Sequence, residues 1–184
     1  MKYSKGDLAK AILKGLVAGG FLTLSLALPN FPQVLKLFKD NNAKSKYKIR
    51  RAFYSLKKNR LVDIYEKNGI DVVEITQKGR KKVLAYKLDE IKIKKSQRWD
   101  GFWRVIIFDI PERHRSARRA LSFKLKEVGL YPLQRSVFIG PFECLNEINF
   151  IGEFFRVRKC IYYFTVKNFD NKEREYHLKN FFDL

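Results

Sequence analysis

Lysines and arginines that could bind phosphate gather between residues 45 and 59 of the chain. Cationic side chains neutralise the phosphates of a nucleic acid and release its counterions, which drives binding. Arginine also grips base edges in the major groove, whereas contacts to phosphate fix position without reading sequence. We therefore expect Arg50, Arg51 and Tyr54 to contact base edges. The expected phosphate contacts are Lys46, Lys48, Lys57 and Lys58. Lys67, at the expected hairpin tip further along the chain, is also expected to bind DNA.

A carboxylate that could take part in metal chemistry, Asp109, ends an apolar run that begins at Trp103. At the end of a strand and beside a two-fold interface, two such aspartates would hold Mg²⁺ together with phosphate oxygens and water. The metal would then activate water against a phosphodiester, which makes Asp109 the candidate catalytic and metal-binding residue. The alternative is a structural role, because Pro111 and Glu112 fit the start of a helix equally well.

Other enzyme signatures are missing from the sequence. It has no glycine-rich phosphate loop, no Gly-x-Ser-x-Gly, no His-Glu-x-x-His and no Cys-x-x-Cys. Its two cysteines, Cys144 and Cys160, and its two histidines match no zinc spacing. We expect reduced thiols and no resident cofactor, with Mg²⁺ at the dimer interface as the alternative.

The distribution of charge predicts where a polyanionic partner binds. The chain of 184 residues has a formal net charge of +20. Residues 1–98 carry 24 basic and 8 acidic side chains, against 15 and 11 in residues 99–184. This asymmetry favours a nucleic acid held mainly by the first half, with an anionic membrane surface as the competing interpretation.

An apolar stretch from Leu16 to Leu28 follows a basic start and imitates a signal peptide. It is shorter than the roughly 20 apolar residues that span a bilayer. Gly19 and Gly20 interrupt it, and Asp7 lies in its basic lead. We expect a buried first helix, no membrane partner and a cytoplasmic protein, with a secretion signal as the alternative.

The basic residues belong to a pattern of elements that is typical of a winged helix-turn-helix domain. Residues 45–59 predict a helix, 61–65 and 70–75 predict two strands, and 67–69 predict the turn between them. Thr76 is the expected N-cap of a second basic helix. Such a domain lays one helix in the major groove while its hairpin touches the backbone or the minor groove. We expect residues 1–91 to form this domain.

A polar, basic segment at residues 92–98 predicts a linker, and the pattern changes after it. Residues 99–184 alternate as strand, helix, two strands, helix and strand, which predicts a ferredoxin-like βαββαβ domain. Asp170 and Glu173 resemble a capping box that opens a helical tail. The helices cover one face of such a sheet, so we expect a second copy to cover the other. The overall fold class is therefore α+β.

Two segments carry a family resemblance. The sequences from Trp99 to Glu112 (WDGFWRVIIFDIPE) and from Gly129 to Gly140 (GLYPLQRSVFIG) resemble the central domain of the phenylacetate-degradation repressor (PaaX-like) family. That domain is itself similar to the small CRISPR-adaptation endonuclease, a ferredoxin-like dimer. With a winged helix before it, the resemblance covers roughly residues 45–168. It implies dimerisation through the second domain, DNA binding by the winged helix, and Asp109 at the position of the nuclease's metal ligand.

Together these observations favour a dimeric transcriptional regulator that binds double-stranded DNA through a winged helix. The alternative is a metal-dependent endonuclease, or a nuclease-derived DNA-scaffolding subunit, that uses Asp109. A third hypothesis is a non-catalytic module whose basic surface meets RNA or a membrane.

Overall fold

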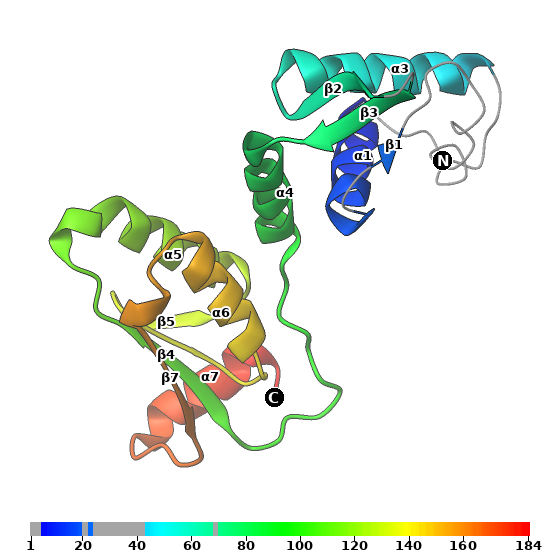
Figure 1. Cartoon of the computed structure of the whole chain (residues 1–184). Coiled ribbons are helices and arrows are strands. Elements are labelled where there is room, and N and C mark those ends of the chain that lie inside the picture. Colours follow the sequence, from blue (N-terminus) through cyan, green and yellow to red (C-terminus); the bar gives the residue numbers. More distant parts are fainter. Residues whose placement is uncertain (1–4, 20–21, 24–42, 68–69) are drawn as a thin grey trace. The chain divides into compact units, whose positions relative to one another are not determined.

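The structure is a computed structural model that describes residues 5–19, 22–23, 43–67 and 70–184 (Figure 1). The chain forms two compact units, residues 1–87 and residues 88–184. The division falls inside the last helix of the first unit, close to the predicted end of the first domain at residue 91. Leu88, Ile91 and Ile93 pack in the core of the second unit, so part of the expected linker belongs to that unit.

The first unit contains helices and a small antiparallel sheet. Strands β2 and β3 form a hairpin, and β1 pairs with the other edge of β3, which gives the order β1-β3-β2. The elements are α1 (Lys5–Gly19), β1 (Leu22–Thr23), α3 (Ala43–Lys58), β2 (Val62–Lys67), β3 (Ile70–Ile75) and α4 (Gln77–Glu90).

The core of the first unit joins the apolar faces of its helices to the sheet. Helix α1 buries Leu8, Ile12, Leu13 and Leu16, so the expected buried first helix is confirmed as far as residue 19. Leu22–Thr23, inside the same apolar stretch, corrects that expectation, because it forms strand β1 and pairs with β3 instead of continuing the helix. Residues 20–21 and 24–28 of the stretch lie outside the described residues. The other buried side chains of this core are Ile49, Ala52, Phe53 and Leu56 on α3, Val62, Val73 and Ile75 on the sheet, and Val83 on α4.

The second unit has the predicted βαββαβ order and an antiparallel sheet with the strand order β5-β6-β4-β7. The strands are β4 (Trp103–Phe108), β5 (Tyr131–Gln134), β6 (Val137–Gly140) and β7 (Ile161–Val166). The helices are α5 (Arg115–Glu127), α6 (Leu145–Phe154) and α7 (Lys172–Phe182). Pro132, which cannot donate a ladder hydrogen bond, lies on the edge strand β5, where that loss is tolerated.

Helices α5 and α6 cover one face of this sheet. Leu121 and Leu125 of α5 and Ile148 and Ile151 of α6 are fully buried against Ile106, Phe108 and Phe138 of the strands. Gly129 ends α5 as predicted, with a φ of 98° that favours glycine. The backbone N–H of Leu130 donates to the carbonyl of Leu125, as expected when a left-handed residue closes a helix.

Helix α7 covers much of the other face, which corrects the expectation that a second copy must bury all of it. Leu178 is fully buried with Trp103 and Ile139, and Phe169 and Phe182 add ring contacts to Trp103. The expected capping residue of this helix was also wrong by one position. The side chain of Asn171, not Asp170, accepts from the backbone N–H of Arg174 at 2.9 Å.

Membrane insertion of a helix finds no support in the described part of the chain. None of its helices combines the length and the apolar character that crossing a bilayer requires.

Candidate nucleic-acid interface

Helix α3 presents a continuous basic and aromatic surface opposite its buried face. Residues spaced three or four apart lie on one side of a helix. Ile49, Ala52, Phe53 and Leu56 point into the core, which leaves the intervening positions exposed to solvent. We call this surface the α3 stripe; its exposed members are Tyr47, Lys48, Arg50, Arg51, Tyr54, Lys57 and Lys58.

The structure therefore brings together six of the eight residues predicted to contact DNA. Tyr54 is 71% exposed although it is aromatic, and Tyr47, which the sequence analysis did not single out, is 63% exposed two turns earlier on the same helix. The two others are Lys46, which lies in α3, and Lys67, at the end of β2. Their side chains, like the hairpin tip at residues 68–69, lie outside the described residues.

A set of backbone contacts fixes α3 relative to the hairpin and to α4. Arg60 takes a positive φ of 56° just after α3, and the hydroxyl of Thr76 donates to its carbonyl at 2.8 Å. The same hydroxyl accepts from the backbone N–H of Gly79 at 3.0 Å, which confirms Thr76 as the N-cap of α4. A Cβ atom at Gly79 would lie 2.1 Å from the carbonyl oxygen of Leu61, so only glycine fits this approach.

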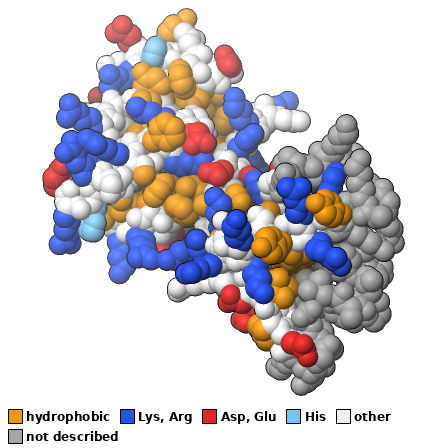
Figure 2. All heavy atoms as spheres, turned by 90° about the horizontal axis from the view of Figure 1, so that it is seen from above, with side chains coloured by type: hydrophobic (Ala, Val, Ile, Leu, Met, Phe, Trp, Pro, Cys, Tyr) orange, Lys and Arg blue, Asp and Glu red, His pale blue; other side chains and the backbone are white. Residues whose placement is uncertain are grey.

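Basic side chains extend beyond the α3 stripe. Arg80, Lys81 and Lys82 of α4 are exposed, as are Lys92, Lys94, Lys95 and Arg98 in the segment that follows. Figure 2 shows Lys and Arg side chains over much of the visible surface, with hydrophobic patches between them. Exposed positive charge therefore occurs in both units and is not confined to one helix.

Asp109 is exposed at the end of β4. Its backbone N–H donates to the carbonyl of Cys160 at 3.0 Å, and the preceding N–H, of Phe108, donates to Ser136. The carboxylate thus follows a strand end held between the β5–β6 turn and the start of β7. Within the described ranges, no three His, Cys, Asp or Glu side chains gather as a metal site, so Asp109 has no such group around it in a single chain.

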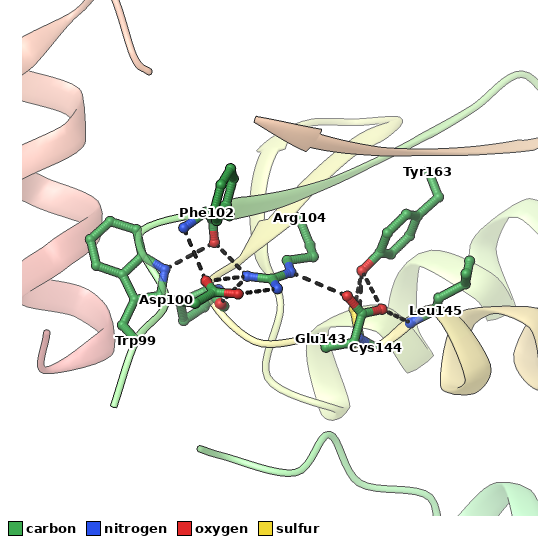
Figure 3. A network of polar contacts seen from close by, with 9 residues as sticks. Trp99, Asp100, Phe102, Arg104, Glu143, Cys144, Leu145 and Tyr163 are labelled. Atoms are coloured by element: carbon green, nitrogen blue, oxygen red, sulfur yellow. Dashed lines mark hydrogen bonds and ion pairs between the residues drawn. The ribbon is translucent and has the colours of Figure 1, made fainter. Parts of the chain in front are cut away.

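Residues at the start of the segment from Trp99 to Glu112, which carries the family resemblance, form a polar network that holds the start of β4 (Figure 3). The guanidinium of Arg104, which is 7% exposed, donates to both carboxylate oxygens of Asp100, at 2.7 and 2.5 Å. It also donates to the carbonyls of Phe102 and Pro141, and it faces Glu143 at 3.5 Å. These residues bind one another, so their geometry indicates a structural role.

The network also shifts the protonation of its members. Hydrogen bonds from Arg104 lower the pKa of Asp100 to about 2. Burial raises the pKa of the Cys144 thiol to about 12, so this thiol stays protonated and unreactive. Burial alone would raise the pKa of Glu143. It is lowered instead, because the backbone N–H of Leu145 and the hydroxyl of Tyr163 donate to the carboxylate.

A second basic site lies in the second unit, and the sequence analysis missed it. An open cleft of about 500 Å³ lies between α5 and the turn that joins β5 to β6. We call it the α5 cleft; its lining residues are Arg115, Arg118, Arg119, Ser122, Phe123, Lys126, Arg135 and Ser136. The helical spacing of the first six was visible in the sequence. The small net charge of residues 99–184 gave no indication of a basic cleft there.

Comparison with known proteins finds a family match within the second unit. Residues 96–177 match the sequence model of the family described as the PaaX protein central Cas2-like domain. A search of curated proteins finds no significant match. The matched range runs from the segment before β4 into α7, and it contains both segments on which the resemblance was based. Residues 96–177 are therefore similar to the central, Cas2-like domain of PaaX proteins.

Proposed function

We propose that this protein is a transcriptional regulator that binds duplex DNA through the α3 stripe and forms a homodimer through its second unit. The observation that carries the proposal is the α3 stripe itself. Its exposed arginines, lysines and tyrosines lie on one helix that leads directly into a hairpin. A helix of this composition fits the major groove, where arginine reads base edges and lysine neutralises phosphates.

The topology of the first unit supports a winged-helix interpretation. In that arrangement the recognition helix precedes a two-stranded wing, and a short strand pairs with the second strand of the wing. Helix α3, the β2–β3 hairpin and the pairing of β1 with β3 follow this order. The PaaX-type second domain adds independent support, because its resemblance implies a repressor that carries such a reader.

The open part of the sheet in the second unit supports a dimer. Tyr162 and Phe164 on the edge strand β7 are 56% and 49% exposed although both are aromatic. They pair in register with Ile107 and Val105 of β4, so these four side chains share one face. Exposed aromatic residues beside a sheet edge are typical of a surface that another chain covers.

The proposal is tested by selecting bound fragments from a random duplex DNA pool at near-physiological salt. A dimeric regulator should enrich a palindromic motif, because the two-fold symmetry of the protein is mirrored in its site. The Arg50→Ala/Arg51→Ala variant should then bind the selected site roughly 10- to 100-fold more weakly, as expected for lost base contacts.

The matched control is Arg80→Ala/Lys81→Ala, which removes two exposed charges from α4 of the same unit. It should weaken binding to all sequences alike and leave the motif unchanged. Equal losses of sequence preference in the two variants would refute α3 as the reading helix. Tight binding without any motif would refute sequence-specific regulation and favour a scaffold or nuclease role.

A further inference from the structure

The α5 cleft is a concentrated site of positive charge in a unit that carries little net charge. Its helical wall is one face of α5, on which cationic, hydroxyl and aromatic side chains recur at intervals of three and four residues. The opposite wall is the β5–β6 turn, which contributes Arg135 and Ser136. Residues of a helix and of a turn therefore converge on one open cleft of about 500 Å³.

The cations of the cleft are only partly neutralised. Arg118 and Arg115 share the carboxylate of Glu112, at 2.5 and 3.7 Å from its oxygens. Arg119, Lys126 and Arg135 have no ion pair with any carboxylate of the described residues. Five cations thus face a single carboxylate. An anion with several charges would relieve their mutual repulsion, and arginine suits phosphate because its planar fork donates two parallel hydrogen bonds.

Phe123 gives the cleft a second kind of contact. Its ring is 71% exposed and lies on the same helical face as the arginines, between Arg119 and Lys126. An exposed aromatic ring among cations is the combination that binds nucleotides, since the base stacks on the ring while the phosphates meet the charges. Ser122 and Ser136 add hydroxyl groups that accept or donate hydrogen bonds.

We propose that the α5 cleft binds the phosphates of a nucleotide, with Phe123 stacked against the base. The nucleotide is either a free nucleoside polyphosphate or part of a single-stranded nucleic acid, which share this chemistry. The site is separate from the α3 stripe and does not depend on the proposed duplex binding.

The test is titration calorimetry of the full chain with ATP, inorganic triphosphate and adenosine at near-physiological salt. ATP should bind, and Arg119→Ala/Arg135→Ala should weaken it at least about tenfold, as expected for lost charge-assisted hydrogen bonds. The matched variant Lys159→Ala/Lys167→Ala removes two exposed charges elsewhere in the unit and should leave the affinity within about twofold. All four positions are exposed, so neither variant threatens the fold.

Phe123→Ala separates stacking from charge. It should weaken ATP binding several-fold and leave the binding of inorganic triphosphate unchanged.

Competition then distinguishes the two sources of the nucleotide. A short oligothymidylate that displaces ATP assigns the cleft to single-stranded nucleic acid, and one that does not displace it assigns the cleft to a free nucleotide. The inference is overturned if neither ATP nor triphosphate binds, or if both double variants bind ATP equally. The Arg50→Ala/Arg51→Ala variant should bind ATP as tightly as wild type does. The nucleotide proposal and the duplex-binding proposal can therefore fail independently of each other.

Discussion

At the scale of single residues, Arg104 is a buried charge of the second unit that contacts several acceptors. It is buried at the start of β4 and satisfies Asp100 and two backbone carbonyls at once. The side chains of Asp100 and Glu143 are 51% and 63% exposed. Water can therefore replace part of their favourable interaction with the guanidinium of Arg104. The network therefore contributes to stability mainly through the backbone groups that it satisfies.

We expect Arg104→Met to lower the free energy of unfolding by roughly 1–3 kcal/mol, because it removes the donor to the carbonyl of Pro141 and one of the two donors to the carbonyl of Phe102, which the indole N–H of Trp99 also contacts. Urea denaturation measures this change. Arg98→Met, at an exposed position a few residues earlier, is the matched control and should stay within about 0.5 kcal/mol of wild type. Equal effects at the two positions would show that the network stabilises nothing.

The lowered pKa of Asp100 predicts a dependence of stability on pH. Its pKa is about 2 in the folded protein, against an ordinary value of 3.8, so the folded state binds the proton less readily than the unfolded state. The stabilisation is fully present above about pH 4 and is lost as the pH falls towards 2. We expect the stability difference between wild type and Asp100→Asn to shrink over this window. A difference that is constant from pH 6 to pH 2 would contradict it.

Asp109 lies outside that network, and its metal role remains a prediction. A lone exposed carboxylate binds Mg²⁺ weakly unless phosphates or a second chain complete the shell. We expect millimolar Mg²⁺ or Mn²⁺ to leave the melting temperature of the protein unchanged in the absence of DNA. A rise in wild type that Asp109→Ala abolishes would instead support the metal ligand that the resemblance implies, and a cleavage assay would follow.

At the scale of elements, α7 covers much of the sheet face that α5 and α6 leave open. We expect Leu178→Ala to cost about 2–5 kcal/mol of stability, as is typical for a fully buried leucine. Tyr176→Ala changes the same helix at a position that is 68% exposed and should cost far less. Thermal and urea unfolding measure both. Similar costs would mean that α7 does not pack on Trp103 in solution.

At the scale of the whole molecule, the proposed dimer depends on the part of the sheet that α7 leaves exposed. We expect light scattering coupled to gel filtration to give the mass of two chains. Tyr162→Asp/Phe164→Asp should raise the dimer dissociation constant by roughly thirtyfold or more, as for loss of an interface hot spot of about 2 kcal/mol. Tyr176→Asp, an exposed aromatic on α7, is the control. A wild-type chain that stays monomeric at micromolar concentration would refute the dimer.

Local features of the chain were predictable because the signals that specify them are local. The apolar spacing of Ile49, Phe53 and Leu56 predicted α3 and its exposed stripe, and Thr76 and Gly129 marked the start of α4 and the end of α5. Caps and periodicity act within one or two turns of a helix, so a single sequence contains them in full. The match of residues 96–177 likewise follows motifs that stand in the sequence.

Only the tertiary structure decided which distant residues meet. It placed Leu178 over Trp103, so the tail of the same chain, rather than a second copy, covers much of that sheet face. It joined Asp100 to Glu143 through Arg104, and it brought Arg135 opposite the arginines of α5. Such contacts depend on how strands order themselves and how helices cross them. Composition and periodicity do not specify the strand order or the helix crossings, because they describe each element separately from the others.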